Sequence, residues 1–462
     1  MSPFMAGMYA PNPGMAAYMA NPYAGMAGMS PFMPGMYPTM GMPGMYPGAG
    51  MGGMPQAAVP QGSPKAMHGG GGMHGGGGGA GGRTKSRGRR RTKGGKDRAP
   101  SADAAAEEPD PNRSPALTEV RKQGTKCKLT LKEVMPDVLE FAQDQHGSRF
   151  LQSKLDEASS EEKQAVFDII LVETPSLAND AFGNFVVQKF FDIGTLDQRR
   201  ALVNQMIPKL LSLSNETHGC RVVQKAIQHV PRESQLAIAN KLKDNVVGCI
   251  ESMHGNHVIQ KCIEQMPPDS VTFIIQAVEN EAEKMASHMY GCRVVQRLLE
   301  HCASHQLQRM LDLILDAIPR LAQDPYGNYV VQHMLEHGRR DDKKRIIAVV
   351  QANIVEFSRH KCSSNVVEKA IEIATIGEHA QVMEEERTAL MRKVIGEPGD
   401  HNPPLRQMMD DRFGNFIVQR MIEHARGPER EQLRQHLVAA EQQLKSSSHG
   451  RHILAALQKE FS

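Results

Sequence analysis

A five-residue motif recurs eight times in this chain, and its first seven copies begin 36 residues apart without drift, from Ser148 to Ser364. The copies occupy residues 148–152, 184–188, 220–224, 256–260, 292–296, 328–332, 364–368 and 415–419. A fixed period of this length is typical of solenoids, in which each repeat buries its apolar side against the next. The periodicity therefore restricts the fold to a stack of repeats before any single residue is considered.

Each copy has the pattern of a helix with one apolar side. Positions 3 and 4 are always Phe, Val, Leu or Ile, whereas positions 1 and 5 are polar or Cys. Positions 1 and 5 are i, i+4 neighbours, so their Cβ atoms lie about 5–6 Å apart on one helix face. We therefore expect positions 3 and 4 in the core and positions 1, 2 and 5 on an open face. A Gly precedes seven of the copies, where a side chain would crowd the neighbouring repeat.

The open positions vary within narrow limits. Position 1 is Asn, Ser or Cys, in the order Ser148, Asn184, Cys220, Asn256, Cys292, Asn328, Ser364 and Asn415. Position 5 is Gln with a single Glu, in the order Gln152, Gln188, Gln224, Gln260, Gln296, Gln332, Glu368 and Gln419. Position 2 is a ring, an Arg or once an Asn, in the order Arg149, Phe185, Arg221, His257, Arg293, Tyr329, Asn365 and Phe416. Packing alone would favour one residue type throughout or drift, so this restricted variation indicates a recognition surface.

Residues 1–115 differ in composition from residues 116–462, which we expect to form the repeat domain. The N-terminal tail is rich in Met, Gly and Pro and poor in Leu, Ile and Val, a composition that predicts disorder. Through Pro115 the chain has 11 basic and 5 acidic residues, whereas the remainder has 43 basic and 46 acidic residues. The repeat domain is not a polycation, so any binding of nucleic acid must depend on placed side chains.

Several other classes of protein are disfavoured. The seven cysteines are scattered without a CxxC pair, which indicates reduced thiols inside a cell. Neither a secretory signal nor an apolar stretch of about 18 residues is visible, so we expect no membrane association. No metal-ligand spacing, phosphate-binding loop or nucleophile–base arrangement stands out, so we expect no enzyme, no metal and no cofactor.

The motifs resemble the Pumilio (PUF) family of RNA-binding proteins, in which each helical repeat binds one base through two or three side chains. The resemblance runs from about Leu117 to Ser462 and includes all eight repeats, with a capping half repeat at each end. It implies an all-α fold, a right-handed α-solenoid or arc of eight three-helix repeats. It also implies that the concave face binds single-stranded RNA, with the first repeat at the 3′ end of the RNA.

The family's pairings assign a base to each combination at positions 1 and 5. Asn with Gln implies uracil, because two amides can complement the acceptors and the donor on its pairing edge. Cys or Ser with Gln implies adenine, since the small residue leaves room for a larger ring. Ser364 with Glu368 implies guanine, whose two adjacent N–H groups suit a carboxylate. From repeat eight back to repeat one, the predicted target is 5′-UGUAUAUA-3′. The position 2 side chains are expected to stack on the bases, and such stacking stabilises the complex by about 1–3 kcal/mol per base.

Two features allow more than one interpretation. A basic residue follows most copies of the motif, at position 6, and it either attracts phosphate or, as we favour, pairs with acids of the adjoining repeat. The last two copies begin 51 residues apart, so about fifteen extra residues are expected near Gly396 to Leu405. These residues form either a protein contact site or a tolerated insertion.

The resemblance implies binding to mRNA 3′ untranslated regions and control of mRNA translation or stability. Its implied partners are single-stranded RNA and protein corepressors, deadenylation factors or translation factors. A monomer in the cytoplasm is expected, and the basic segment 83–98 is compatible with nuclear shuttling, with RNA anchoring or with a solvated linker. Two alternatives are a HEAT- or armadillo-like scaffold that binds peptide and a nucleolar relative of the family that binds structured RNA. The varying pairs at positions 1 and 5 speak against the scaffold, and the presence of a complete set of recognition side chains in every repeat speaks against the nucleolar relative.

Overall fold

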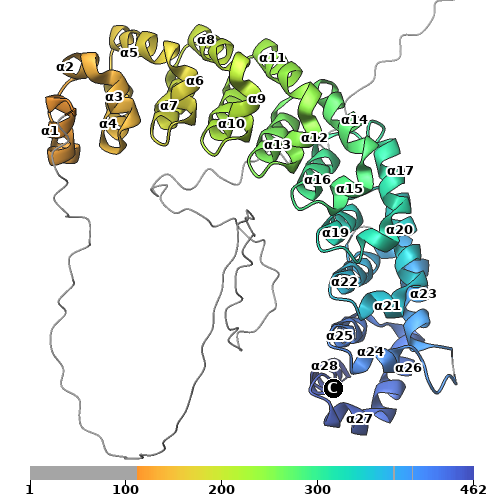
Figure 1. Cartoon of the computed structure of the whole chain (residues 1–462). Helices are drawn as coiled ribbons and strands as arrows, with labels where there is room; N and C mark the ends of the chain where they lie inside the picture. The colour runs from red at the N-terminus through yellow and green to blue at the C-terminus, as the bar shows by residue number, and fades with distance from the viewer. Residues whose placement is uncertain (1–111, 378–379, 398, 462) are drawn as a thin grey trace, which may run out of the picture. The chain divides into compact units, whose positions relative to one another are not determined.

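The computed structural model describes residues 112–377, 380–397 and 399–461. Every regular element within these ranges is a helix, and the helices stack into an arc (Figure 1). The predicted all-α solenoid of three-helix repeats is thereby confirmed. Most of the tail, including the basic segment 83–98, lies outside the described residues, so its predicted disorder stays a prediction.

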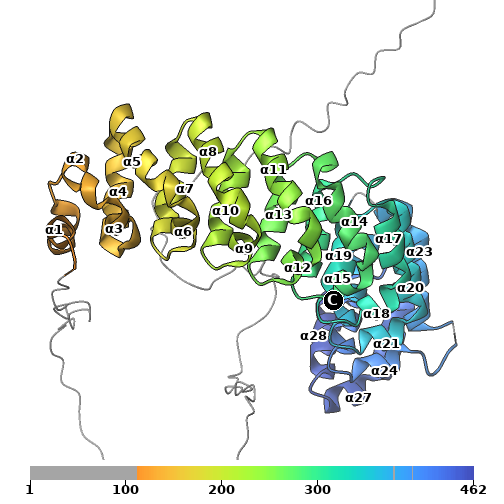
Figure 2. The same cartoon turned by 45° about the horizontal axis from the view of Figure 1, so that its top comes forward.

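Each repeat contributes an outer, a middle and an inner helix, and the three rows follow one another along the arc in both views (Figures 1 and 2). The inner row consists of α4 (Gln145–Glu157), α7 (Gly183–Ile193), α10 (Gly219–His229), α13 (Gly255–Gln265), α16 (Gly291–His301), α19 (Gly327–His337), α22 (Ser363–Thr375) and α25 (Gly414–His424). The middle row consists of α3 (Val138–Gln143), α6 (Thr174–Asn179), α9 (Leu210–Asn215), α12 (Val246–Glu251), α15 (Ala282–Ser287), α18 (Ile318–Leu321), α21 (Ile354–Ser358) and α24 (Leu405–Met409). The outer row consists of α2 (Leu131–Val134), α5 (Ser160–Val172), α8 (Leu196–Met206), α11 (Arg232–Leu242), α14 (Thr272–Asn280), α17 (Gln308–Asp316), α20 (Arg340–Ala352) and α23 (Glu384–Ile395).

The inner helices pack against one another in chain order and lie on the concave side of the arc (Figure 1). Every copy of the five-residue motif lies on one of them. One continuous apolar core runs through the described residues, and positions 3 and 4 of every motif belong to it. Val186 and Val187, for example, are fully buried. The predicted division between core and open positions is therefore correct for positions 3 and 4.

Both ends of the stack are capped by helices that lack the motif. At the N-terminal end α1 (Pro115–Gln123) packs against α4, and its first turn is stabilised by the Ser114 hydroxyl, which accepts from the Leu117 N–H. At the C-terminal end α26 (Gly427–Ala439), α27 (Glu441–Ser446) and α28 (Gly450–Phe461) form a capping unit. It has three helices, as a full repeat does, where the sequence suggested half a repeat.

The insertion near repeat eight is divided between two places. The outer helix α23 begins at Glu384, which is 21 residues after the first residue of α22. In the preceding repeat unit, α20 begins at Arg340, only 13 residues after the first residue of α19. A second extra segment joins Ile395, the end of α23, to Leu405, the start of α24. The expected loop near Gly396 to Leu405 thus accounts for about half of the extra residues, and the other half precedes α23.

All seven cysteines are free thiols. Among the described residues, no helix is both long and apolar enough to cross a membrane.

Candidate nucleic-acid interface

The Gly before each motif sets how closely the inner helix approaches its own middle helix. A Cβ built on Gly291 would lie 2.5 Å from the carbonyl oxygen of Met285, and the glycines before the other motifs meet the equivalent carbonyl oxygen at 2.5–3.1 Å. The sequence suggested crowding by the neighbouring repeat, but in most repeats the obstacle is the backbone of the preceding helix. In repeat seven Ser363 replaces the Gly, and its buried hydroxyl donates to the Phe357 carbonyl at 2.9 Å.

A polar side chain four residues before position 1 caps most of the inner helices. Asp180, for example, accepts from the N–H groups of Phe182 and Gly183 at 2.8 and 2.7 Å. The same arrangement recurs at Asp144, Ser252, His288, Asp324, His360 and Asp411. These bonds satisfy N–H groups that a helix start otherwise leaves unpaired. Sequence analysis missed this series, although its 36-residue spacing is visible in the chain.

Position 2 carries the most exposed side chains of the motif. Phe185, Tyr329 and Phe416 are 40%, 49% and 52% exposed although they are aromatic. Arg149, Arg221 and Arg293 are exposed as well, and His257 and Asn365 are partly exposed. The guanidinium carbon of Arg293 lies 5.9 Å from the centre of the Tyr329 ring in the next repeat. At this pair, the flat groups of two successive repeats approach one another on the inner row.

Position 1 is more enclosed than the sequence suggested. Its eight side chains are each 8% exposed or less, in the order Ser148, Asn184, Cys220, Asn256, Cys292, Asn328, Ser364 and Asn415. Their donors are used within their own repeat, mostly in the turn that leads into the inner helix: Asn184 Nδ2 donates to the carbonyls of Asp180 and Ala181 at 2.8 and 3.0 Å. The Ser hydroxyls and Cys thiols point to the carbonyl three residues earlier. This burial follows from the tight packing of the inner helices, which covers position 1 of each motif and leaves position 2 accessible.

Position 5 lies above position 1 and adopts two arrangements that depend on it. Where position 1 is Asn, the Gln Nε2 donates to the Asn Oδ1, as Gln188 does to Asn184 at 2.8 Å. Gln260, Gln332 and Gln419 follow the same pattern. Where position 1 is small, Gln152 and Gln224 donate instead to the backbone carbonyl of position 1 at 3.1 Å. In these six repeats the place where the Gln amide is held therefore varies with the residue at position 1, although Gln419 also donates to the Asn415 carbonyl at 3.3 Å.

Two position 5 side chains depart from both arrangements. Gln296 is 7% exposed and its Nε2 has no hydrogen-bond partner in the structure. A buried donor without a partner costs about 1–3 kcal/mol, so an acceptor supplied by a ligand would be favoured here. Glu368, the single acid of the series, accepts from Arg420 Nε at 2.6 Å.

The two thiols and the one imidazole of the motif are held neutral. Burial raises the pKa of the Cys220 and Cys292 thiols, so both stay protonated at neutral pH. Burial, with a smaller contribution from His254, lowers the pKa of His257, so its ring is uncharged at pH 7. Within the described residues the motif series therefore presents neutral amides and rings, three Arg side chains and the Glu368 carboxylate.

The basic residues at position 6 are mostly engaged with acids. Lys189 pairs with Asp156 and Lys225 with Asp192, in each case an acid of the preceding repeat. Lys261 and Arg297 instead pair with Glu264 and Glu300 of their own helices. These contacts agree with the interpretation we favoured, pairing over phosphate attraction, although the partner is not always in the adjoining repeat.

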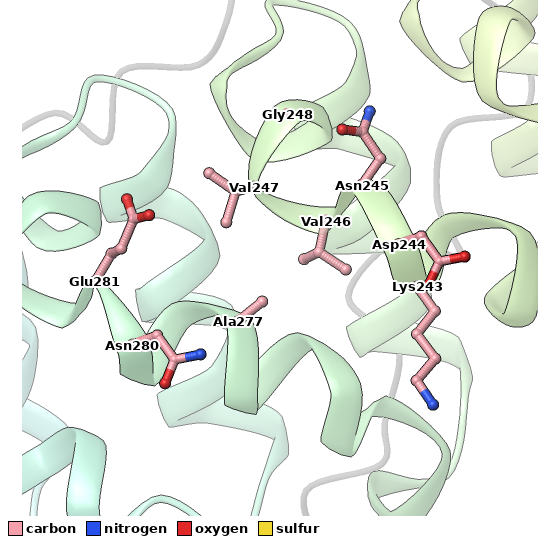
Figure 3. Close-up of a pocket in the computed structure, with 9 residues that line it drawn as sticks. All are labelled: Lys243, Asp244, Asn245, Val246, Val247, Gly248, Ala277, Asn280 and Glu281. Atoms are coloured by element: carbon pink, nitrogen blue, oxygen red, sulfur yellow. The ribbon is translucent and has the colours of Figure 1, made fainter.

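One surface cavity lies away from the motifs. It has a volume of about 290 Å³ and is lined by the segment from Lys243 to Gly248 and by Ala277, Asn280 and Glu281 (Figure 3). These residues belong to middle and outer elements of repeats four and five, and none is part of a motif. Over the described ranges, no group of three or more His, Cys, Asp or Glu side chains could hold a metal ion.

The fold and the inner surface define a class of protein, an α-solenoid whose concave face presents one set of recognition side chains per repeat. A model of the Pumilio-family RNA-binding repeat matches residues 137–171, 175–207, 209–243, 252–279, 283–315 and 318–350. A model of the NOP9-like PUF repeat domain matches residues 344–452. The chain belongs to the Pumilio (PUF) family of RNA-binding proteins, as its sequence suggested.

Solved structures and curated proteins agree with this assignment. The structure of PUF-8 in complex with PBE-RNA is 34% identical, covers 75% of this chain and 99% of that chain, and superposes with a TM-score of 0.69. The Puf3 RNA-binding domain bound to a Cox17 RNA 3′ UTR recognition sequence is 33% identical over 74% of this chain and 100% of that chain, with a TM-score of 0.65. The maternal protein pumilio of Drosophila melanogaster is 46% identical over 69 residues, which are 15% of this chain and 4% of that protein.

Proposed function

We propose that this chain binds single-stranded RNA with the sequence 5′-UGUAUAUA-3′, one base per repeat, through positions 1, 2 and 5 of its inner helices. The observation that carries the proposal is the alternation of Asn with a small residue at position 1 along one continuous row of helices, which the Gln arrangement follows in repeats one to four and six. Gln held by Asn alternates with Gln beside Ser or Cys in repeats one to six, as A and U alternate in the proposed target. The row is interrupted at Glu368, where the target has its only G.

The hydrogen bonds of the free side chains refine how each base would be recognised. Because both N–H groups of Asn184 are engaged with carbonyls, the Gln188 amide is the main group left to meet a uracil edge. Its Oε1 can accept the uracil N3–H, while the second Nε2 hydrogen can reach a carbonyl oxygen of the base. The Asn then serves mainly to fix the orientation of the Gln amide, and its remaining Oδ1 lone pair is its own contribution to the site.

The Pumilio-family relatives support a role in controlling messenger RNA. A Puf3 domain was solved with a 3′ UTR recognition sequence, and we propose that this chain likewise docks on 3′ untranslated regions and regulates translation or stability. It would do so by bringing corepressors, deadenylation factors or translation factors to the transcript. Crosslinking of the chain to cellular RNA should therefore enrich UGUAUAUA in 3′ untranslated regions, and enrichment confined to ribosomal RNA would contradict this.

A titration of the full chain with labelled 5′-UGUAUAUA-3′ and with one single-base variant at each of its eight positions, at fixed salt, tests the proposed target. A mismatched base leaves polar groups unpaired, so each substitution should raise the Kd by a factor of about 5 to 150, which corresponds to about 1–3 kcal/mol. Equal binding of all variants would exclude base recognition by these repeats.

One alternative to test is the binding of structured RNA by a relative of the family, since residues 344–452 match a separate model, that of the NOP9-like PUF repeat domain. A hairpin that carries the same eight bases within its stem separates the two functions. If single-stranded recognition is correct, pairing hides the base edges and the hairpin should bind more weakly than the open strand. Tighter binding of the hairpin would favour the alternative.

A further inference from the structure

The acid of repeat seven makes a contact that no other position 5 side chain makes. Glu368 on α22 accepts at Oε1 from Nε of Arg420 on α25, at 2.6 Å, so the contact joins repeat seven to repeat eight. The Glu368 and Arg420 side chains are 28% and 43% exposed, so the pair lies at the accessible inner surface. A recognition side chain is thus linked to a charged residue of the neighbouring repeat.

This pairing departs from the pattern at other repeats. A position 6 residue that reaches the preceding repeat usually finds the acid at position 9, as Lys225 finds Asp192 at 2.6 Å and His333 finds Glu300 at 2.9 Å. In repeat seven the position 9 acid is Glu372, which pairs with Lys369 of its own helix at 3.0 Å. Arg420 contacts position 5 instead.

Arg420 is itself held at two points. Its Nη1 donates to Glu423 Oε2 at 2.7 Å while its Nε donates to Glu368. The planar guanidinium of Arg420 is held by two hydrogen bonds, so it can keep the Glu368 carboxylate in one orientation. The ammonium group of a lysine would do this less well. A carboxylate has about four lone-pair sites on its two oxygens. Arg420 occupies one of them, so two N–H donors of a guanine edge can still be accepted.

We propose that Arg420 is a positioning residue that orients and charge-compensates Glu368 for selection of guanine at the second base. The inference rests on the proposed function, because it assumes that Glu368 meets that base. Without Arg420, the carboxylate would rotate freely and stand uncompensated beside an RNA backbone that carries negative charge. Guanine would then lose its preordered acceptor. Uracil presents two acceptors and one donor, and so gains little from the carboxylate in either case.

Binding of the full chain to 5′-UGUAUAUA-3′ and 5′-UUUAUAUA-3′ tests the proposal, with the ratio of the two Kd values as the readout. Arg420→Ala should lower the preference for G over U about five- to tenfold, within the coupling expected of contacting side chains. Arg420→Lys should retain part of this preference, because the lysine keeps the positive charge but lacks the planar guanidinium with its several N–H donors. Arg297→Ala is the matched control: Arg297 also occupies position 6, but it pairs with Glu300 at 2.5 Å and not with a position 5 side chain. The control should leave the ratio unchanged.

A double-mutant cycle separates orientation of Glu368 from a general effect of charge. In a Glu368→Gln background, Arg420→Ala should not change the ratio further, since the carboxylate that it orients is gone. An equal loss of affinity for both RNAs, or a gain in G preference, would overturn the proposal by indicating phosphate contact or competition with the base. Thermal unfolding of each variant shows whether it is folded. If Arg420→Ala does not fold, the proposal is tested with Arg420→Lys.

The proposal and the proposed function fail in distinguishable ways. If the unmodified chain shows no preference for G at the second base, the assignment of repeat seven is wrong. If it prefers G and Arg420→Ala retains that preference in full, only the role of Arg420 is wrong.

Discussion

Repeat seven and the other repeats solve the same packing problem differently. Elsewhere a Gly lets the inner helix approach its middle helix, whereas Ser363 fills that place and bonds to the Phe357 carbonyl. Elsewhere position 5 is a neutral amide bonded within its own repeat or, at Gln296, unpartnered, whereas Glu368 is bonded to Arg420 of the next repeat. Position 2 is a ring or an Arg elsewhere and Asn365 here.

The difference shows which features the stack needs and which belong to recognition. The core at positions 3 and 4 is unchanged in repeat seven, since Val366 and Val367 are fully buried. Every substitution that sets repeat seven apart lies on the inner surface or at the start of its inner helix. The fold therefore tolerates one repeat with different surface chemistry, as it must if repeats are to differ in the base they select.

Exchanging the chemistry of repeat seven for that of repeat six should have the largest effect. Ser364→Asn with Glu368→Gln should move the preference at the second base from G to U, with a change in relative affinity of about 5- to 150-fold. The reciprocal change in repeat six, Asn328→Ser with Gln332→Glu, should move the third base from U toward G. Binding of single-base RNA variants measures both, and retention of G by the first variant would contradict the assignment of repeat seven.

The packing difference should appear as a difference in stability. Gly291→Ala places a Cβ 2.5 Å from the Met285 carbonyl oxygen, an overpacked contact that should cost about 1–3 kcal/mol of unfolding free energy. Ser363→Gly should cost less, about 0.5–1.5 kcal/mol, because it removes one hydrogen bond. Gly248→Ala is the control, since its Cβ would meet only the side chain of Asn245. Urea unfolding gives the order, and a harmless Gly291→Ala would refute the packing argument.

The smallest effect concerns pH. Burial lowers the pKa of His229 and His337 below the ordinary 6.5, and Ile373 occupies their position in repeat seven. Between the two pKa values the unfolded chain binds more protons than the folded chain, so stability is highest above about pH 6.5 and falls as the pH drops through the folded-state values. His229→Gln with His337→Gln should flatten this dependence, since repeat four already has Gln265 there. Urea midpoints at pH 5.5, 6.5 and 7.5 check it; a midpoint that rises on acidification would contradict it.

The sequence predicted the solenoid and the location of the site because both depend on periodicity. The 36-residue spacing and the apolar positions 3 and 4 are enough to place the motifs on one row of helices. The engagement of Asn184 with its own carbonyls was not predictable, since it depends on how tightly the inner helices pack. That the extra residues before repeat eight lie in two separate segments was not predictable either, because the spacing of the motifs gives only the total number of inserted residues. The contact between Glu368 and Arg420 spans 52 residues and that insertion, so no local pattern marks it.

The hydrogen bonds of position 1 have a consequence for how such a protein can change. At Ser148, Asn184, Cys220 and their counterparts, the bonded partners all lie in the same helix or in the turn that leads into it. A substitution there breaks no hydrogen bond to an adjoining repeat, so we expect that most bases of the target can be changed one at a time during evolution or engineering. The guanine base is the exception, because the Glu368 side chain is bonded to the next repeat, so a change at Glu368 also releases Arg420 from that contact.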